Sequence, residues 1–136
     1  MISPRRRLVQ LYRSMAMTET PDWMEAARRA ALRLGADTAG AKGANHALYV
    51  ALLEDRRRPC RWGLYVGETS RDPDVRFDQH KTGYKASGVV RRCGVRLLPF
   101  LVTHLNPLHR WEAVELEPAL AEAFARAGVP WVEGGH

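Results

Sequence analysis

A chain of 136 residues, 46% of them hydrophobic and 26% charged, has room for one domain with its own core and a short arm. No apolar run approaches the roughly 20 residues that span a bilayer, and the N-terminus is too polar for a signal peptide. Cys60 and Cys93 lack the spacing of a metal site, which favours free thiols in a reducing compartment. We therefore expect a cytoplasmic protein with no membrane partner.

The formal net charge of +6 is concentrated on the middle of the chain. Residues 46–110 contain twelve Lys or Arg and six Asp or Glu, whereas residues 111–136 contain one and five. A basic surface attracts polyanions because it releases their counterions, whatever their sequence. The alternative is a solvated basic surface that serves only solubility.

Residues 1–45 are expected to form a basic arm, a helix and a flexible linker. Thr20 and Pro21 have the pattern of a helix start, a hydroxyl cap followed by proline in the first turn. Apolar residues then recur at helical spacing up to Gly35. The small residues at 35–45 predict the linker.

Two strands and a helix are expected next. Residues 46–53 and 62–69 predict a hairpin across a polar turn. Asp72, followed by proline and a second acid, predicts a helix that runs to about Thr82. Residues 84–94 are then expected to form a basic connection.

The remaining elements complete a single domain over residues 46–130. Residues 95–105 predict a third strand, in which Pro99 indicates an edge or a bulge. A last helix is expected over 106–127, and residues 131–136 are expected to be a tail. The fold class is α/β (α+β), with a small, mostly antiparallel three-stranded sheet flanked by helices and an N-terminal helical extension.

Five residues with the chemistry to cut a phosphodiester occur in order along these elements. They are Tyr49, Tyr65, Arg76, His80 and Glu117. A guanidinium suits phosphate, a carboxylate suits a hard divalent cation, and a phenol or an imidazole can position or deprotonate water. Taken singly, each has an ordinary structural reading, such as a strand tyrosine in the core or an arginine on a helix surface.

The same residues resemble the motifs of the GIY-YIG nuclease superfamily. Ala-Leu-Tyr at 47–49 stands at the family's first tripeptide and Tyr-Val-Gly at 65–67 at its second. The helix at 72–80 is similar to the family's helix with arginine and histidine, and Glu117 stands at its glutamate. The resemblance covers residues 46 to about 127.

The resemblance implies a metal-dependent endonuclease that hydrolyses DNA phosphodiester bonds, with Mg²⁺ or Mn²⁺ as cofactor. Glu117 would hold the metal, Arg76 would bind the scissile phosphate, and His80 would orient a tyrosine or carry a proton. Tyr49, together with Tyr65, would position or deprotonate the attacking water. No base-reading module is evident, so we expect weakly sequence-selective or structure-directed cutting, or targeting by a protein partner.

Further contacts to DNA are expected from a glycine beside the site and from basic residues of the middle segment. They are Gly67, Arg56, Arg57, Arg58, Arg71, Lys81, Lys85, Arg91 and Arg92. For the arginines of the hairpin turn, a solvated tip is an equal alternative.

Three residues depart from the family pattern, and the first, Ala47 in place of a glycine in the first tripeptide, is conservative in size. Glu68 is a carboxylate that would repel phosphate unless it pairs with Arg71 or another cation. Pro118 directly follows Glu117 and predicts a kink or a restart of the helix there. The last two departures favour an alternative function, a nucleic-acid-binding module on the same fold without turnover. A protein-interaction domain is a third alternative.

Overall fold

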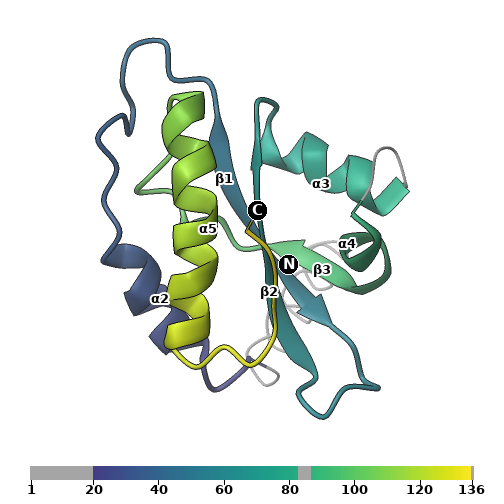
Figure 1. The fold of residues 1–136 in the computed structure, drawn as a ribbon. Coiled ribbons are helices and arrows are strands. Elements are labelled where there is room, and N and C mark those ends of the chain that lie inside the picture. Colours follow the sequence, from purple (N-terminus) through teal and green to yellow (C-terminus); the bar gives the residue numbers. More distant parts are fainter. Residues whose placement is uncertain (1–19, 83–86, 136) are drawn as a thin grey trace, which may run out of the picture.

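The computed structural model describes residues 20–82 and 87–135 (Figure 1). Four strands form one sheet in the order β3-β1-β2-β4. They are β1 (Ala47–Glu54), β2 (Trp62–Thr69), β3 (Gly94–Leu97) and β4 (Val132–Gly134). The α+β class with a sheet between helices is confirmed, but the sheet has four strands where three were expected.

The helices cover both faces of the sheet. They are α2 (Met24–Leu32), α3 (Pro73–Thr82), α4 (Gly88–Cys93), the 3-10 turn η1 (Pro99–Leu101) and α5 (Arg110–Arg126). In Figure 1, α2 and α5 lie on one side of the sheet, and α3 and α4 lie on the other. Within the described ranges, no helix has the length and apolar character needed to cross a membrane.

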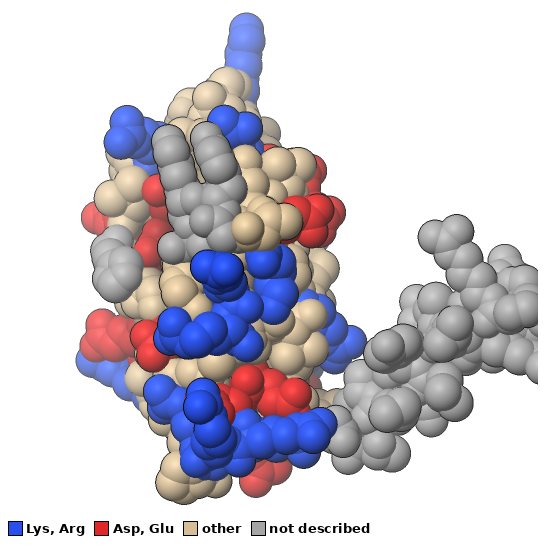
Figure 2. All heavy atoms as spheres, turned by 90° about the vertical axis from the view of Figure 1, so that its right-hand side faces the viewer, with Lys and Arg blue, Asp and Glu red and all other residues tan. Residues whose placement is uncertain are grey.

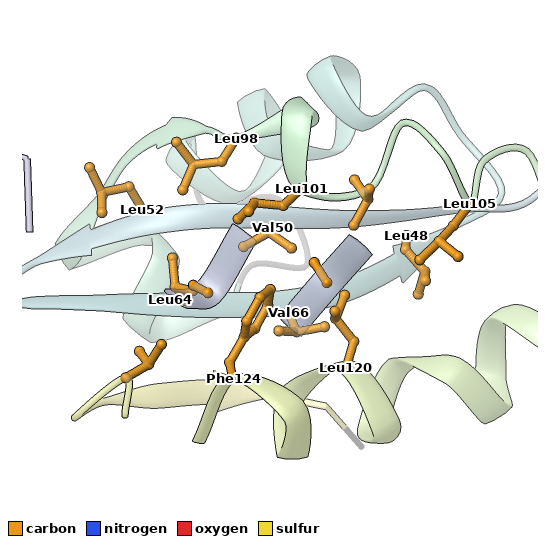
Figure 3. Packing of buried hydrophobic residues seen from close by; sticks show 14 of the residues in the cluster. Leu48, Val50, Leu52, Leu64, Val66, Leu98, Leu101, Leu105, Leu120 and Phe124 are labelled. Carbon is orange, nitrogen blue, oxygen red and sulfur yellow. The ribbon is translucent and has the colours of Figure 1, made fainter. Parts of the chain in front are cut away.

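The core lies between the sheet and the α2–α5 face (Figure 3). Leu48, Val50 and Leu52 alternate along β1 and pack in this core, where Phe124 of α5 is also buried. Burying side chains of this size stabilises the fold by about 1.5–3 kcal/mol each. Strand side chains alternate between faces, so Tyr49 and the other odd-numbered residues of β1 point toward α3 and α4. Because both faces of β1 are covered, it is a continuous apolar run in the sequence.

The third strand is shorter than expected, because β3 ends at Leu97. Pro99 starts η1 instead of continuing the strand, since proline has no backbone N–H to pair with β1. The expected connection at 84–94 contains α4, whose N-cap residue Ser87 accepts a hydrogen bond from the N–H of Val90. The expected last helix begins only at Arg110, because the residue before it is extended.

The fourth strand lies in the segment that was expected to be a tail. Residues Val132–Gly134 pair in parallel with Leu64–Val66 of β2. Trp131, just before β4, packs against Gly63, where an added Cβ would lie 2.6 Å from the indole. Strand β4 has only three residues, too few for an alternating strand pattern to be visible in the sequence.

The segment before β1 is attached to the domain. Helix α2 begins at Met24, with Trp23 at the N-cap position and no side-chain cap, so the expected hydroxyl cap at Thr20 is wrong. The loop that follows is held by Glu112 of α5, which accepts hydrogen bonds from the N–H groups of Asp37 (2.8 Å) and Thr38 (2.7 Å). The expected basic arm lies outside the described residues.

Candidate functional site

Three aromatic rings from β1, β2 and α3 form a cluster on the side of the sheet that faces α3. The ring centroids of Tyr49 and Tyr65 are 6.0 Å apart, and both rings lie about 6 Å from that of His80. The two tyrosines are diagonal neighbours across the antiparallel pair, since Tyr49 lies opposite Gly67 and Tyr65 opposite Ala51. Tyr49 is 3% exposed and His80 is 2% exposed, so their positions are fixed by packing.

Gly67 is what allows Tyr49 to lie across β2. A Cβ built at Gly67 would overlap the ring and hydroxyl of Tyr49. No side chain larger than hydrogen fits there unless the phenol moves. Gly67 was expected to contact substrate; the contact that the structure records is this close approach to the phenol.

His80 is held from both of its ring nitrogens. The backbone N–H of Ser87 donates to Nδ1 (2.7 Å), and Nε2 lies 2.9 Å from the hydroxyl of Tyr49. Because Nδ1 accepts, a neutral ring carries its proton on Nε2 and donates it to Tyr49. Burial, aided by the positive charge of Arg76, holds the pKa of His80 below its usual value, which favours this neutral form.

The pKa of Tyr49 is affected by burial and by the neighbouring groups of the site. Burial is the main cause that raises the pKa of Tyr49, followed by the neighbouring Tyr65. Arg76 lowers the pKa and Glu117 raises it. Both charged groups are therefore close enough to act on the phenol, and all five predicted catalytic residues lie in one region. In the free protein, Tyr49 is protonated at neutral pH.

Glu117 comes from α5 and is 7% exposed. The helix is continuous from Arg110 to Arg126. No break is observed at Pro118, where a kink or a restart was expected. Proline has no N–H, so the backbone hydrogen bond from position 118 to the carbonyl of Val114 is missing. Val114 is exposed, so water can bond to its carbonyl instead.

The other acids of α5 have different surroundings. Glu115 and Glu122 are exposed, and Glu122 pairs with Arg126 at 2.6 Å. Glu112 is buried, but it binds the loop at Asp37 and Thr38. Glu117 is thus the acid of α5 whose charge acts at the ring cluster.

The donor set decides what kind of metal ion the site suits. In residues 20–82 and 87–135, no group of three or more His, Cys, Asp or Glu side chains is arranged to hold a metal. A single buried carboxylate fits Mg²⁺ or Mn²⁺, since Mg²⁺ keeps several waters and uses oxygens of a substrate phosphate.

Beside the ring cluster is an open cleft of about 470 Å³ that contains three arginines, which we call the arginine cleft. It is lined by His46, Glu68, Thr69, Ser70, Arg71, Arg76, Gln79 and Arg110. Arg76 donates to the side-chain oxygen of Gln79 at 3.2 Å, which orients the guanidinium. The sequence did not indicate Arg110, because it is far along the chain from Arg76 and only the fold brings the two into one cleft.

Glu68 gives the arginine cleft a carboxylate. Its Oε2 is buried and has no hydrogen-bond partner among the described residues. The recorded contact of Glu68 is with Nε2 of His46 at 3.9 Å, and no ion pair between Glu68 and Arg71 is recorded among the described residues. At this distance the pair is not a hydrogen bond, and the carboxylate reduces the positive charge of the cleft.

The arginines of the hairpin turn are paired locally. Arg56 lies 3.5 Å from Glu54, and Arg57 lies 3.3 Å from Asp55. Arg58 stacks over the indole of Trp131 with its guanidinium carbon 3.9 Å from the ring centroid. At the lower end of the molecule in Figure 2, acidic and basic residues are mixed on the surface.

The described basic residues near α4 are all exposed, but one of them also makes structural hydrogen bonds. Lys81 of α3 donates to the carbonyls of Arg91 (3.1 Å) and Gly94 (2.9 Å), which attaches α3 to the end of α4. Arg91 and Arg92 are exposed, and basic atoms gather over the middle of the face seen in Figure 2. Lys85 lies outside the described residues.

Comparison of the chain with protein-family models, with curated proteins and with solved structures found no match. The site is therefore interpreted from its own geometry and chemistry. Its distinctive feature is a buried phenol that contacts an imidazole and a second phenol, with one guanidinium and one carboxylate acting on it.

Proposed function

We propose that this protein is a metal-dependent endonuclease that hydrolyses DNA phosphodiester bonds, with weak sequence selectivity or direction by DNA structure. The observation that supports this most is the gathering of Tyr49, Tyr65 and His80 into one ring cluster, with the charges of Arg76 and Glu117 acting on it. The resemblance to the GIY-YIG superfamily points to the same chemistry.

Substrate binding is assigned to the arginine cleft. Arg76 lies both in this cleft and close enough to Tyr49 to affect its pKa, so a phosphate bound by Arg76 would lie near the phenol. A guanidinium can donate two parallel hydrogen bonds to phosphate, and Gln79 limits its freedom. Arg71 and Arg110 would contact neighbouring phosphates of the same strand.

Tyr49 is the proposed base for the attacking water. Its raised pKa means that it must lose its proton to act, and added positive charge at the site favours that loss. A divalent cation held by Glu117 would supply Lewis-acid stabilisation of the charge on the phosphate oxygens. His80 contributes by donating its Nε2–H to the Tyr49 oxygen, which stabilises the phenolate and fixes its orientation. Tyr49 first loses its proton to solvent. The oxygen of the attacking water then forms a bond to phosphorus while its proton passes to the Tyr49 oxygen. The P–O bond to the leaving strand breaks, and the leaving oxygen takes a proton from solvent.

The decisive experiment is a cleavage assay on plasmid and branched DNA with Mg²⁺, Mn²⁺ or EDTA. We expect metal-dependent cleavage that Glu117→Gln and Arg76→Ala each reduce by at least about 10²-fold. Glu115→Gln is the matched control, because Glu115 is an exposed acid on the same helix. Undiminished cleavage in both site variants would show that this proposal is wrong.

A nucleic-acid-binding module without turnover is the second candidate, and Glu68 is the observation that favours it. Its carboxylate lies in the arginine cleft and would repel the phosphate of a substrate. This candidate predicts salt-dependent binding of DNA with no product in either metal, and equal binding by Glu117→Gln. Product formation that depends on Glu117 would exclude it.

A further inference from the structure

Trp111 is exposed beside the arginine cleft. It lies in the first turn of α5 and is 57% exposed, the most exposed of the large hydrophobic side chains described. Val114, one turn further, is also exposed, so the two share a face of the helix. Tryptophan is buried to a large extent in most proteins. An exposed indole beside a charged cleft is therefore a candidate binding surface.

The surroundings of Trp111 connect it to the cleft. A second, shallower hollow of about 730 Å³ is lined by Asn45, His109, Arg110, Trp111 and Val114. Arg110 lines both this hollow and the arginine cleft. Asn45 is also joined to the cleft, because its side-chain oxygen lies 2.9 Å from Nδ1 of His46. The two hollows are therefore neighbours that share Arg110.

We infer that a nucleic-acid strand bound in the arginine cleft continues past Arg110 and stacks an unpaired base on the indole of Trp111. The inference rests on the proposed function and adds the class of substrate, a single strand or a duplex with a single-stranded branch. A base inside a duplex has both faces covered by its neighbours, so only an unpaired base offers a face to Trp111. Stacking on an aromatic side chain beside a cationic groove is how proteins hold single strands without reading their sequence.

The charge of this surface favours nucleic acid over a protein partner. Arg110 lines both the hollow that contains the indole and the cleft that contains Arg71 and Arg76, so phosphates and a stacked base would be bound on neighbouring surfaces. The apolar area is small, since Trp111 and Val114 are its only hydrophobic lining residues in the described structure. A stable protein interface buries about 800 Å² on each partner.

Binding to a fluorescently labelled single-stranded oligonucleotide and to a blunt duplex, both in EDTA, tests the inference. We expect Trp111→Ala to weaken single-strand binding by about 5- to 100-fold at every salt concentration. Trp111→Phe, which keeps an aromatic face, should keep most of the affinity. Arg110→Ala should instead lower the slope of log affinity against log salt by about one.

Phe100→Ala is the matched control, because Phe100 is another exposed aromatic residue and lines neither hollow. It should bind as the unmodified protein does. Stacking should also quench indole emission on binding, and this quenching should be lost in Trp111→Phe. Unfolding temperatures of all variants confirm that an exposed residue was changed without loss of the fold.

Three outcomes would overturn the inference. The first is unchanged single-strand binding by Trp111→Ala, and the second is an equal loss for the blunt duplex. The third is self-association, or binding of a partner protein, that depends on Trp111 while oligonucleotide binding does not. Failure of the proposed function is distinguishable, because it would appear as absent metal-dependent cleavage while the effect of Trp111→Ala on binding persists.

Discussion

Tyr49 and Gly67 lie opposite each other on β1 and β2, and the phenol ring of Tyr49 occupies the space that a side chain at position 67 would need. The glycine is thus a condition for the position of the proposed base. The hydrogen bond between Tyr49 and His80 depends on this same position.

Gly67→Ala is therefore expected to impair both stability and cleavage. Overpacking of this kind costs about 1–3 kcal/mol in the free energy of unfolding. Urea denaturation and the cleavage assay measure the two effects. In the double variant with Tyr49→Ala, the stability cost of Gly67→Ala should disappear, because the ring that it overlaps is gone. Gly35→Ala, at a position with nothing within 4 Å of the added atom, is the control.

Tyr49→Phe should reduce the cleavage rate by about 10²- to 10⁴-fold, the usual contribution of a general base. Binding to DNA in EDTA should not change, because the ring and its packing remain. The raised pKa of Tyr49 means that the phenolate becomes more abundant through the neutral and alkaline range, so the rate should rise with pH. A pH–rate profile that keeps this rise in Tyr49→Phe would assign the base elsewhere.

The lowered pKa of His80 predicts that the folded protein loses stability in mild acid. Its pKa in the folded protein is below the ordinary value of 6.5, so the unfolded chain binds its proton more readily. The stabilising contribution of the neutral ring is therefore complete above pH 6.5 and is lost as the pH falls through the folded pKa. Protonation at Nδ1 would also remove the acceptor for the N–H of Ser87.

Urea unfolding at a series of pH values measures this contribution. His80→Gln should show a weaker loss of stability below pH 6.5 than the unmodified protein, whereas His104→Gln, which leaves His80 in place, should retain the loss. An identical pH dependence in His80→Gln would contradict the assignment of a neutral ring.

The two buried glutamates of α5 should behave in opposite ways. Glu112→Gln is expected to lower the unfolding temperature by several degrees and leave cleavage by the folded protein intact, because Glu112 binds the loop at Asp37 and Thr38. Glu117→Gln should abolish cleavage with a smaller effect on stability. Calorimetry and the cleavage assay on the same samples separate the two roles.

The effect of Glu112 should also depend on pH. Hydrogen bonds from Thr38 and Asp37 hold the pKa of Glu112 below its ordinary value of 4.5. Its contribution is therefore present above pH 4.5 and is lost as the pH falls through the folded pKa. The difference in stability between the unmodified protein and Glu112→Gln should shrink on acidification; a constant difference would argue against a charged Glu112.

Arginines of the cleft and of the hairpin turn should differ in the salt dependence of DNA binding. Arg71 lines the cleft, and its loss in Arg71→Ala should lower the salt slope by about one. Arg57 pairs with Asp55, so Arg57→Ala should change the slope little. An equal change in both variants would place the hairpin turn in the DNA-binding surface.

Several elements could be predicted from local sequence. The hairpin was expected because apolar runs flank a polar turn, and α3 was expected because Asp72 and Pro73 have the pattern of a helix start. In the structure, Asp72 accepts a hydrogen bond from the N–H of Asp74 at 2.9 Å, as such a start requires. The short elements α4 and β4 were not visible, because a few residues carry too little periodicity.

By itself, the sequence determined which residue types were present in which order, and hence that two phenols, a guanidinium, an imidazole and a carboxylate were candidates for one site. Tertiary structure alone decided how they meet: Gly67 makes room for Tyr49, Ser87 selects the tautomer of His80, and Arg110 joins the cleft to Trp111. The physical reason is that these relationships depend on distances of a few ångströms between separate elements, and such distances follow from how strands and helices pack.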